Sequence, residues 1–209
     1  MKRILFLIAI SVLIAGLHSG CRQAVLSENE IALVWSGEAN EPLPVLTIHH
    51  KADSLFLREP ARKIKPKHVS DSTIQHLKKR MYSTVTSPKV DGIGIAAPQV
   101  GVGIQMIYVQ RLDKTGYPFE VFFNPEIIAY GDSINSGMEG CLSVPFMRGN
   151  VERSHNIDIA YLDSLGNRKQ ESISGFTAVI FQHEIDHLNG VLYFDHIFNG
   201  FEALIQIDN

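Results

Sequence analysis

Apolar and polar residues follow two different periods along this chain. Apolar residues recur every three or four positions over residues 70–82, which predicts a helix that Ser70 or Asp71 can cap. The same spacing returns over residues 176–187 and predicts a second helix near the C-terminus. Both helices would pack one apolar side against the rest of the fold.

In four other stretches, apolar and polar residues alternate with a period of two, which is typical of β-strands. Strands are predicted over residues 105–110, 121–123, 157–161 and 170–173, and residues 163–167 read as a hairpin loop between the last two. Hairpin-connected strands pair antiparallel, and a helix that covers them gives an α+β fold. We therefore expect antiparallel strands packed around the C-terminal helix.

The first twenty residues have a different pattern. Lys2 and Arg3 precede a continuous apolar run over residues 4–17, which is too short to span a bilayer comfortably. Small residues then lead to Cys21. This arrangement predicts that residues 1–20 form a secretory signal peptide.

Cys21 resembles the lipid-modified cysteine of bacterial lipoproteins, although His18 stands where that pattern usually has leucine. The alternative is an uncleaved apolar helix that anchors the chain to a membrane. We read residues 21–43 as a tether, with residues 31–35 docking on the domain, because polar residues, glycine and proline punctuate it. The folded domain would then occupy residues 44–209.

Length, composition and net charge indicate which classes of protein this chain can belong to. The 209 residues suit one domain with an appendage, and 45% hydrophobic residues suffice for a sizeable core. A net charge of −3 gives no electrostatic case for nucleic-acid binding. Two cysteines in different contexts argue against a disulfide framework. We expect a monomer.

The predicted C-terminal helix carries the sequence His183-Glu184-Ile-Asp-His187. Residues four apart lie about 40° apart around a helix, so both imidazoles project from one face and can share a metal ion. Glu184 can then reach a water molecule without binding the metal itself. The alternative is an ordinary amphipathic helix with two surface histidines. Asp186 could orient the site or be a surface carboxylate.

A third metal ligand is available upstream in the sequence EGCLSVP, residues 139–145. A catalytic zinc-type site usually takes three protein ligands, and the thiolate of Cys141 is a strong ligand for zinc or ferrous iron. Glu139 and Gly140 before Cys141, and Pro145 after it, indicate a turn or the end of a strand, where a side chain can face a cleft. A buried structural cysteine is the alternative.

Residues 92–99, GIGIAAPQ, form a small-residue stretch. Glycines let a substrate backbone approach closely, and Gln99 brings an amide that can donate a hydrogen bond. Taken alone, this stretch is a plain loop, because it lacks the context of a dinucleotide or phosphate site.

The three stretches GIGIAAPQ, EGCLS and QHEIDH, in this order, resemble those of the peptide deformylases. These are metal hydrolases that remove the formyl group from N-terminal formyl-methionine. The resemblance runs from about residue 44 to 198 and makes residues 44–209 a deformylase-like catalytic domain. One departure is residues 53–58, where the family's D-P-x-L-R segment has an inserted residue and no proline.

The resemblance implies a role for each matching residue. Glu184 would be the general base, and Gln99 and the backbone N–H of Leu142 would stabilise the developing oxyanion. Glu139 would orient the site. The implied metal ligands are Cys141, His183 and His187.

The resemblance also implies a substrate site. Ile93, Phe176 and Val179 would line an apolar pocket for the methionine side chain, unless they are simply core residues. Gly94 and Arg148 would contact the peptide, although Arg148 could equally be a solvated loop residue. The other histidines, including His49, His50 and His155, show no ligand spacing and are read as surface or tether residues.

Metal identity does not follow from the ligands, because a Cys/His₂ set suits zinc, ferrous iron or nickel. The resemblance implies ferrous iron. Export would expose ferrous iron and a thiolate ligand to oxidising conditions, so zinc stands beside iron as the expected cofactor.

The expected function is hydrolysis of N-formylmethionyl peptides to formate and methionyl peptides. Export conflicts with this expectation, since nascent formylated chains are made in the cytoplasm. The second reading is an exported HExxH metallopeptidase or N-acyl peptide hydrolase. The third hypothesis is a non-catalytic lipoprotein that binds formyl peptides. Glu184 argues against it, because a protein that only binds peptides has no need of a general base. We expect a membrane-associated lipoprotein or periplasmic protein, with a cytoplasm-facing anchored form as the alternative.

Overall fold

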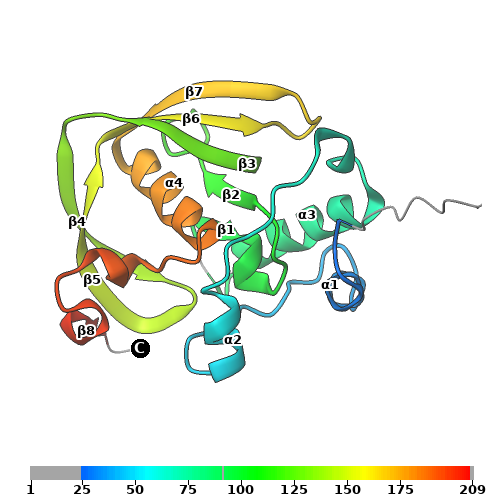
Figure 1. Cartoon of the computed structure of the whole chain (residues 1–209), viewed down its shortest axis with the longest axis horizontal. Helices are drawn as coiled ribbons and strands as arrows, with labels where there is room; N and C mark the ends of the chain where they lie inside the picture. Colours follow the sequence, from blue (N-terminus) through cyan, green and yellow to red (C-terminus); the bar gives the residue numbers. More distant parts are fainter. Residues whose placement is uncertain (1–24, 91, 208–209) are drawn as a thin grey trace, which may run out of the picture.

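The computed structural model describes residues 25–90 and 92–207, so the predicted signal peptide and Cys21 lie outside the described residues. Two antiparallel sheets enclose a central helix (Figure 1). The first sheet has the strand order β1-β2-β3-β6-β7 and the second has the order β4-β5-β8. The helices are α1 (Glu28–Val34), α2 (Lys51–Phe56), α3 (Ser72–Val85) and α4 (Gly175–Leu188). The strands are β1 (Gly94–Ala96), β2 (Met106–Gln110), β3 (Phe119–Tyr130), β4 (Ile134–Cys141), β5 (Val144–Ser154), β6 (Asn156–Leu162), β7 (Arg168–Ser174) and β8 (Ile205–Gln206). Short 3₁₀ turns lie at Pro66–His68, Ala97–Val100, Tyr193–His196 and Gly200–Ala203.

Helix α4 is buried because most of its surface is apolar. Ile180, Phe181, Ile185 and Leu188 pack with side chains from β2 and β6 in one core cluster. The ring of Phe181 meets that of Phe122 edge-to-face at a centroid distance of 4.7 Å, a favoured aromatic geometry. These contacts fix the position and rotation of α4.

Helix α3 packs in a second core cluster, together with residues of β1 and β2, and a third, smaller cluster lies between β5 and the residues after α4. Its N-cap is Asp71, whose side chain accepts a hydrogen bond from the Thr73 backbone N–H at 2.9 Å. The predicted helix at 70–82 is therefore confirmed, with the second of its two possible caps.

The α+β class with antiparallel sheets is confirmed, and each predicted strand lies within or largely overlaps a strand of the first sheet. The hairpin loop between β6 and β7 is closed by a hydrogen bond from the Asp163 N–H to the Asn167 carbonyl, at 2.9 Å. The C-terminal residues add β8 to the edge of β5, which pairs with it at Met147–Gln206 and Arg148–Ile205.

In the described part of the predicted tether, residues 21–43, Leu26, Val34 and Leu43 are buried in the core, so the expected docking of residues 31–35 is observed and extends beyond them. Helix α1 begins with a capping box between Ser27 and Glu30, and Val34 is fully buried. The guanidinium of Arg80 in α3 donates hydrogen bonds to the carbonyls of Leu33 and Val34 at 3.0 Å, so it caps the end of α1. Glu30, one of the polar residues that indicated a tether, holds α1 in place by accepting hydrogen bonds from Arg62 and from the Gly103 N–H.

Residues 44–66 also contain structure that the sequence did not predict. Helix α2 occupies Lys51–Phe56, and Leu57 directly after it is fully buried. Within residues 25–90 and 92–207, every helix is too short or too polar to cross a bilayer.

Candidate metal centre and active-site cleft

Three potential metal ligands converge where α4 meets the end of β4. His183 and His187 lie one turn apart on α4, and Cys141 is the last residue of β4. One ligand atom from each residue lies within 4.8 Å of the others, and Cys141 Sγ is 3.2 Å from His187 Nε2. The strand end expected for Cys141 is therefore observed, and the structure brings the three predicted ligands together.

The chemistry of this group fits a divalent metal. A thiolate and two imidazoles are a donor set that zinc, ferrous iron and nickel accept. Glu139 binds Nδ1 of His183 at 2.8 Å, which leaves Nε2 of that ring for a metal. Each of the three residues thus offers one donor atom to a common point.

The electrostatic environment also favours a cation. Burial raises the pKa of the Cys141 thiol, but the His187 and His183 imidazoles outweigh burial and hold the pKa well below its ordinary value. Burial lowers the pKa of His183, yet Cys141 and Glu139 hold it well above its ordinary value. The thiolate and carboxylate therefore stabilise positive charge at this point.

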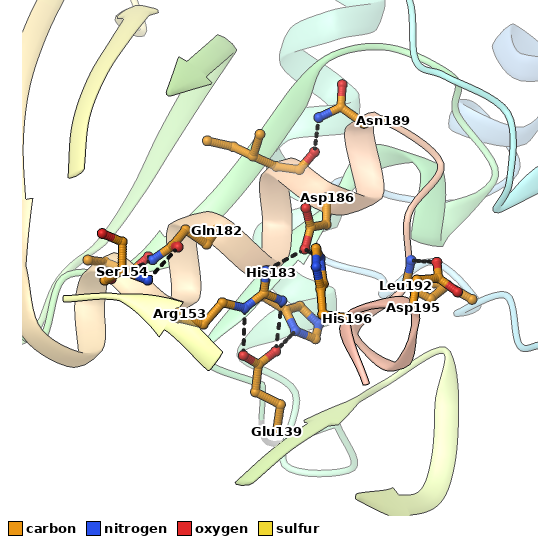
Figure 2. Close-up of polar contacts among 12 residues, drawn as sticks. Glu139, Arg153, Ser154, Gln182, His183, Asp186, Asn189, Leu192, Asp195 and His196 are labelled. Carbon is orange, nitrogen blue, oxygen red and sulfur yellow. Dashed lines mark hydrogen bonds and ion pairs between the residues drawn. The ribbon is translucent and has the colours of Figure 1, made fainter. Parts of the chain in front are cut away.

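Behind the metal group, a buried ion network holds His183 in place. Figure 2 shows the Arg153 guanidinium between two carboxylates. It donates to Glu139 Oε1 at 2.8 Å and Oε2 at 3.1 Å, and to Asp186 Oδ2 at 2.6 Å. Burial raises the pKa of Glu139, but hydrogen bonds from His183 and Arg153 reverse this and lower it to about 2. Glu139 is thus an anion that orients the His183 ring.

The same network resolves the role of Asp186 and reveals residues that sequence reasoning missed. Asp186 is not a free surface carboxylate, because it binds Arg153 and also His196 Nε2 at 2.8 Å (Figure 2). The sequence predicts His196 only as a surface histidine, and its pattern does not single out Arg153. Arg153 is the last but one residue of β5, a strand that the sequence pattern does not predict, so no signal in the sequence marked it.

Glu184 lies beside the metal group with its carboxylate buried. The residue is 4% exposed, and Oε2 has no hydrogen-bond partner among the described residues. Burial raises the pKa of Glu184 to about 7, against the opposing effect of the two imidazoles. A carboxylate that titrates near neutrality suits proton transfer at neutral pH.

Gln99 reaches the site from the 3₁₀ turn after β1. Its Oε1 accepts a hydrogen bond from the Ala96 N–H at 2.8 Å, so its amide NH₂ faces Ser143 Oγ at 3.3 Å and Cys141 Sγ at 3.6 Å. Leu142 follows Cys141 directly in the turn between β4 and β5. Both predicted hydrogen-bond donors therefore lie next to the metal group.

A cleft of about 530 Å³ opens over these residues. Ile93 and Phe176 are 37% and 55% exposed, so they are not core residues but walls of this cleft. Predicted residues along the cleft are Ile93, Gly94, Gln99, Glu139, Cys141, Leu142, Arg148, Phe176, Val179, His183 and Glu184. Met138, Phe146 and Ile207 line it as well and were not predicted.

The antiparallel α+β fold, with a Cys/His/His group beside a buried carboxylate at a peptide-sized cleft, defines a metal-dependent hydrolase. The family model described as polypeptide deformylase matches residues 42–200. Peptide deformylase 2 of Nostoc sp. is 35% identical over 172 residues, which cover 79% of this chain and 92% of that protein. A peptide deformylase of Synechocystis sp. is 38% identical over 157 residues, covering 75% of this chain and 81% of that protein. This chain belongs to the polypeptide deformylase family.

Solved structures agree with this assignment. A class I type b peptide deformylase from Acinetobacter baumannii, with Met-Ala-Ser bound, is 34% identical and superposes with a TM-score of 0.67. The match covers 76% of this chain and 99% of that one. A peptide deformylase from Synechococcus elongatus in complex with actinonin is also 34% identical, with a TM-score of 0.62 over 78% of this chain and 82% of that one.

Proposed function

We propose that this chain hydrolyses the formyl amide of N-terminal formyl-methionine in peptides. Water is consumed, the C–N bond of the formamide breaks, and formate and a free methionyl amine result. The observation that carries this proposal is the position of Glu184 and Gln99 beside the group of Cys141, His183 and His187 in one cleft. Membership of the polypeptide deformylase family supports it.

Cys141, His183 and His187 would hold the divalent metal. When bound, the metal supplies Lewis acidity, which makes a water molecule a competent nucleophile near neutral pH. Glu139 keeps the His183 ring oriented through its 2.8 Å contact with Nδ1, and Arg153 keeps Glu139 in position. This support fixes the direction of one ligand before the metal arrives.

Glu184 transfers the proton. Its carboxylate accepts a proton from the attacking water and delivers it to the amine as the C–N bond breaks. Negative charge develops on the formyl oxygen, and the Gln99 amide with the Leu142 backbone N–H donates hydrogen bonds to it. Because Ala96 fixes the Gln99 amide, this donor needs no rearrangement during the reaction.

The cleft walls would position the peptide. Ile93, Phe176 and Val179 form an apolar wall suited to the methionine side chain, while Gly94 and Arg148 contact the peptide backbone. The Acinetobacter relative with Met-Ala-Ser bound and the Synechococcus relative with actinonin bound support a peptide substrate for this cleft.

The proposal is tested by formate release from formyl-Met-Ala-Ser, with acetyl-Met-Ala-Ser as the matched control. A deformylase should turn over the formyl peptide at least about tenfold faster, since one extra methyl group in a tight site typically costs that much. Equal rates would indicate a general N-acyl peptide hydrolase, and internal cleavage of the peptide would indicate a metallopeptidase.

The expected metal is ferrous iron or zinc, although the donor set also accommodates nickel. Elemental analysis of protein isolated anaerobically from its native source distinguishes them. Stoichiometric zinc would fit an exported protein, and stoichiometric iron would rule out zinc as the native ion.

We also propose that the chain is exported and anchored to a membrane through Cys21. The apolar run over residues 4–17 and the small residues before Cys21 support this. Mass spectrometry of the N-terminal peptide should show cleavage before Cys21 and an added lipid, both absent in Cys21→Ser. An intact, unmodified N-terminus would instead indicate an uncleaved anchor. The monomeric state also stays a prediction.

A further inference from the structure

Helix α1 lies outside the part of the chain that matches the deformylase family model, which begins at residue 42. One side of α1 packs on the domain through Glu30 and Val34, which are both buried. Its other side carries Ile31, and Trp35 follows one turn later, with its N–H bonded to the Ile31 carbonyl at 3.0 Å. These two apolar side chains are 36% and 51% exposed, so they do not serve the core.

The exposed ring of Trp35 is nevertheless held in a fixed position. It stacks on the His76 ring of α3 at a centroid distance of 4.1 Å, and its indole N–H donates to Thr73 Oγ1 at 3.3 Å. Lys79 lies one turn further along α3 from His76 and is exposed. Tryptophan gathers at the boundary between water and a lipid bilayer, and lysine beside apolar residues is typical of surfaces that bind there.

The chain that precedes α1 limits where this surface can lie. Leu26 is buried in the core, five residues after Cys21, and α1 begins two residues after Leu26. Five fully extended residues span at most about 18 Å. A lipid attached to Cys21 would therefore keep α1 within that distance of the bilayer.

The active-site cleft lies away from this surface. Helices α1 and α3 lie at one end of the molecule, and strands β4 and β5, which form one side of the cleft, lie at the other end (Figure 1). Contact between α1 and a bilayer would thus leave the cleft open to dissolved peptides.

We propose that Ile31, Trp35 and Lys79 form a membrane-contact patch, which lies against the surface of an anionic lipid bilayer. This patch rests on the proposed lipidation of Cys21, because the short connection to Leu26 is what brings the patch to the bilayer. It does not depend on the reaction in the cleft. The anchored domain therefore has one preferred orientation on the membrane.

Trp35 is the one tryptophan of the chain, so its fluorescence reports on the patch directly. The full chain, carrying its N-terminal lipid, is reconstituted in vesicles of phosphatidylcholine and phosphatidylglycerol, with and without lipids that bear a nitroxide quencher near the head group. We expect the Trp35 emission to shift to shorter wavelength in the vesicles and to lose most of its intensity with the quencher. Lys79→Glu should lower the ratio of quenched to unquenched protein by about fivefold, the effect of one basic residue near an anionic surface.

The double variant Trp35→Phe/Phe198→Trp moves the fluorophore away from the patch. Phe198 is 90% exposed and lies two residues before the 3₁₀ turn at Gly200–Ala203, which leads into β8 beside β5. Its tryptophan should keep its intensity in the same vesicles. Equal quenching at positions 35 and 198 would show that the domain has no preferred orientation and would overturn the patch.

Flotation of the vesicles separates the patch from the anchor. Unquenched Trp35 in protein that floats with the vesicles would overturn the patch and leave the lipid anchor standing, whereas protein that does not float would overturn both. Protection of Trp35 from iodide that grows with protein concentration in the absence of vesicles would place a second copy of the chain on this surface and overturn the bilayer contact. Formate release by the same sample tests the proposed reaction separately.

Discussion

Gly94 lies directly against the carboxylate of Glu184. A Cβ atom at position 94 would overlap Oε1 and lie 2.9 Å from Cδ of Glu184. Any residue other than glycine must therefore displace the group that we assign to proton transfer. This contact gives a mechanical reason for glycine in the GIGIAAPQ stretch, beyond access for a substrate backbone.

Gly94→Ala should lower kcat by about 10²-fold or more, since a positioned general base typically contributes 10²–10⁴-fold. Metal content should be unchanged, because the displaced residue is not a ligand. Formate release and elemental analysis of the same sample check both statements.

Gly137→Ala is the matched control for this variant. A Cβ atom there meets nothing within 4 Å, so activity should stay near the wild-type value. Full activity in Gly94→Ala would show that the position of Glu184 does not limit the reaction.

Arg153→Met should weaken metal binding by about 10–100-fold, the usual effect of losing a group that orients a ligand. The change leaves Glu139 and Asp186 buried without their common partner, and it should lower the free energy of unfolding by about 3–5 kcal/mol. Chelator competition measures the affinity, and denaturant unfolding measures the stability.

Arg168→Met, on the exposed side of β7, provides the comparison. The variant removes the same charge but leaves the contacts of Arg153 with Glu139 and Asp186 intact. Neither the metal affinity nor the free energy of unfolding should change appreciably. If Arg153→Met retained wild-type metal affinity, the network would be structural only.

Glu30 should make stability depend on pH. Burial raises the pKa of Glu30, but hydrogen bonds from Arg62, Ser27 and the Gly103 N–H outweigh it, so the folded-state pKa lies below the ordinary value of 4.5. A depressed carboxyl pKa stabilises the fold fully above about pH 4.5, and this contribution is lost as pH falls through the folded-state pKa.

Glu30→Gln should lower the free energy of unfolding by about 1.5–3 kcal/mol at pH 7, the usual contribution of hydrogen bonds to a charged group, and by less at lower pH. Glu126→Gln, which breaks the exposed pair with Lys63, should cost less than about 1 kcal/mol. Denaturant unfolding of the wild-type protein and of both variants at pH 7 and pH 3 measures these losses. An equal loss for Glu30→Gln at the two pH values would contradict the predicted pH dependence.

Removing the metal should expose a reactive thiolate. Burial raises the pKa of the Cys141 thiol, but the His187 and His183 imidazoles hold this pKa well below its ordinary value, which favours the thiolate, and a bound metal would protect the sulfur. In a Cys21→Ser background Cys141 is the one remaining cysteine. Iodoacetamide should then modify the chelator-treated protein quickly and the metal-loaded protein slowly, as mass spectrometry would show. Equal rates would argue against Cys141 as a ligand.

The sequence predicts the elements whose apolar period reflects burial. Helix α4, helix α3 and strand β2 each bury a regular set of apolar residues, and their predicted ranges lie within a few residues of the observed ones. The convergence of Cys141 with α4 was also predictable, since ligand chemistry restricts which residues can share a metal.

Strand β4 was not predicted because its residues do not show the alternation of apolar and polar positions that burial of one face produces. Seven of its eight residues are exposed or half-buried, and Glu139 is the one that is buried. The strand is held by backbone pairing with β5 rather than by an apolar face. Helix α1 was missed for a related reason, since Glu30 and Arg80 hold it through polar contacts that depend on partners distant in the sequence.

The most direct test of the account is the rate of formate release from formyl-Met-Ala-Ser by the metal-loaded wild-type protein and by Glu184→Gln. Glutamine keeps the shape of the side chain but cannot accept the proton from water. We expect turnover by the wild-type protein and a loss of about 10²–10⁴-fold in kcat for the variant, at equal metal content. Comparable turnover by Glu184→Gln would contradict the assignment of Glu184, and no turnover by the metal-loaded wild-type protein would contradict deformylation itself.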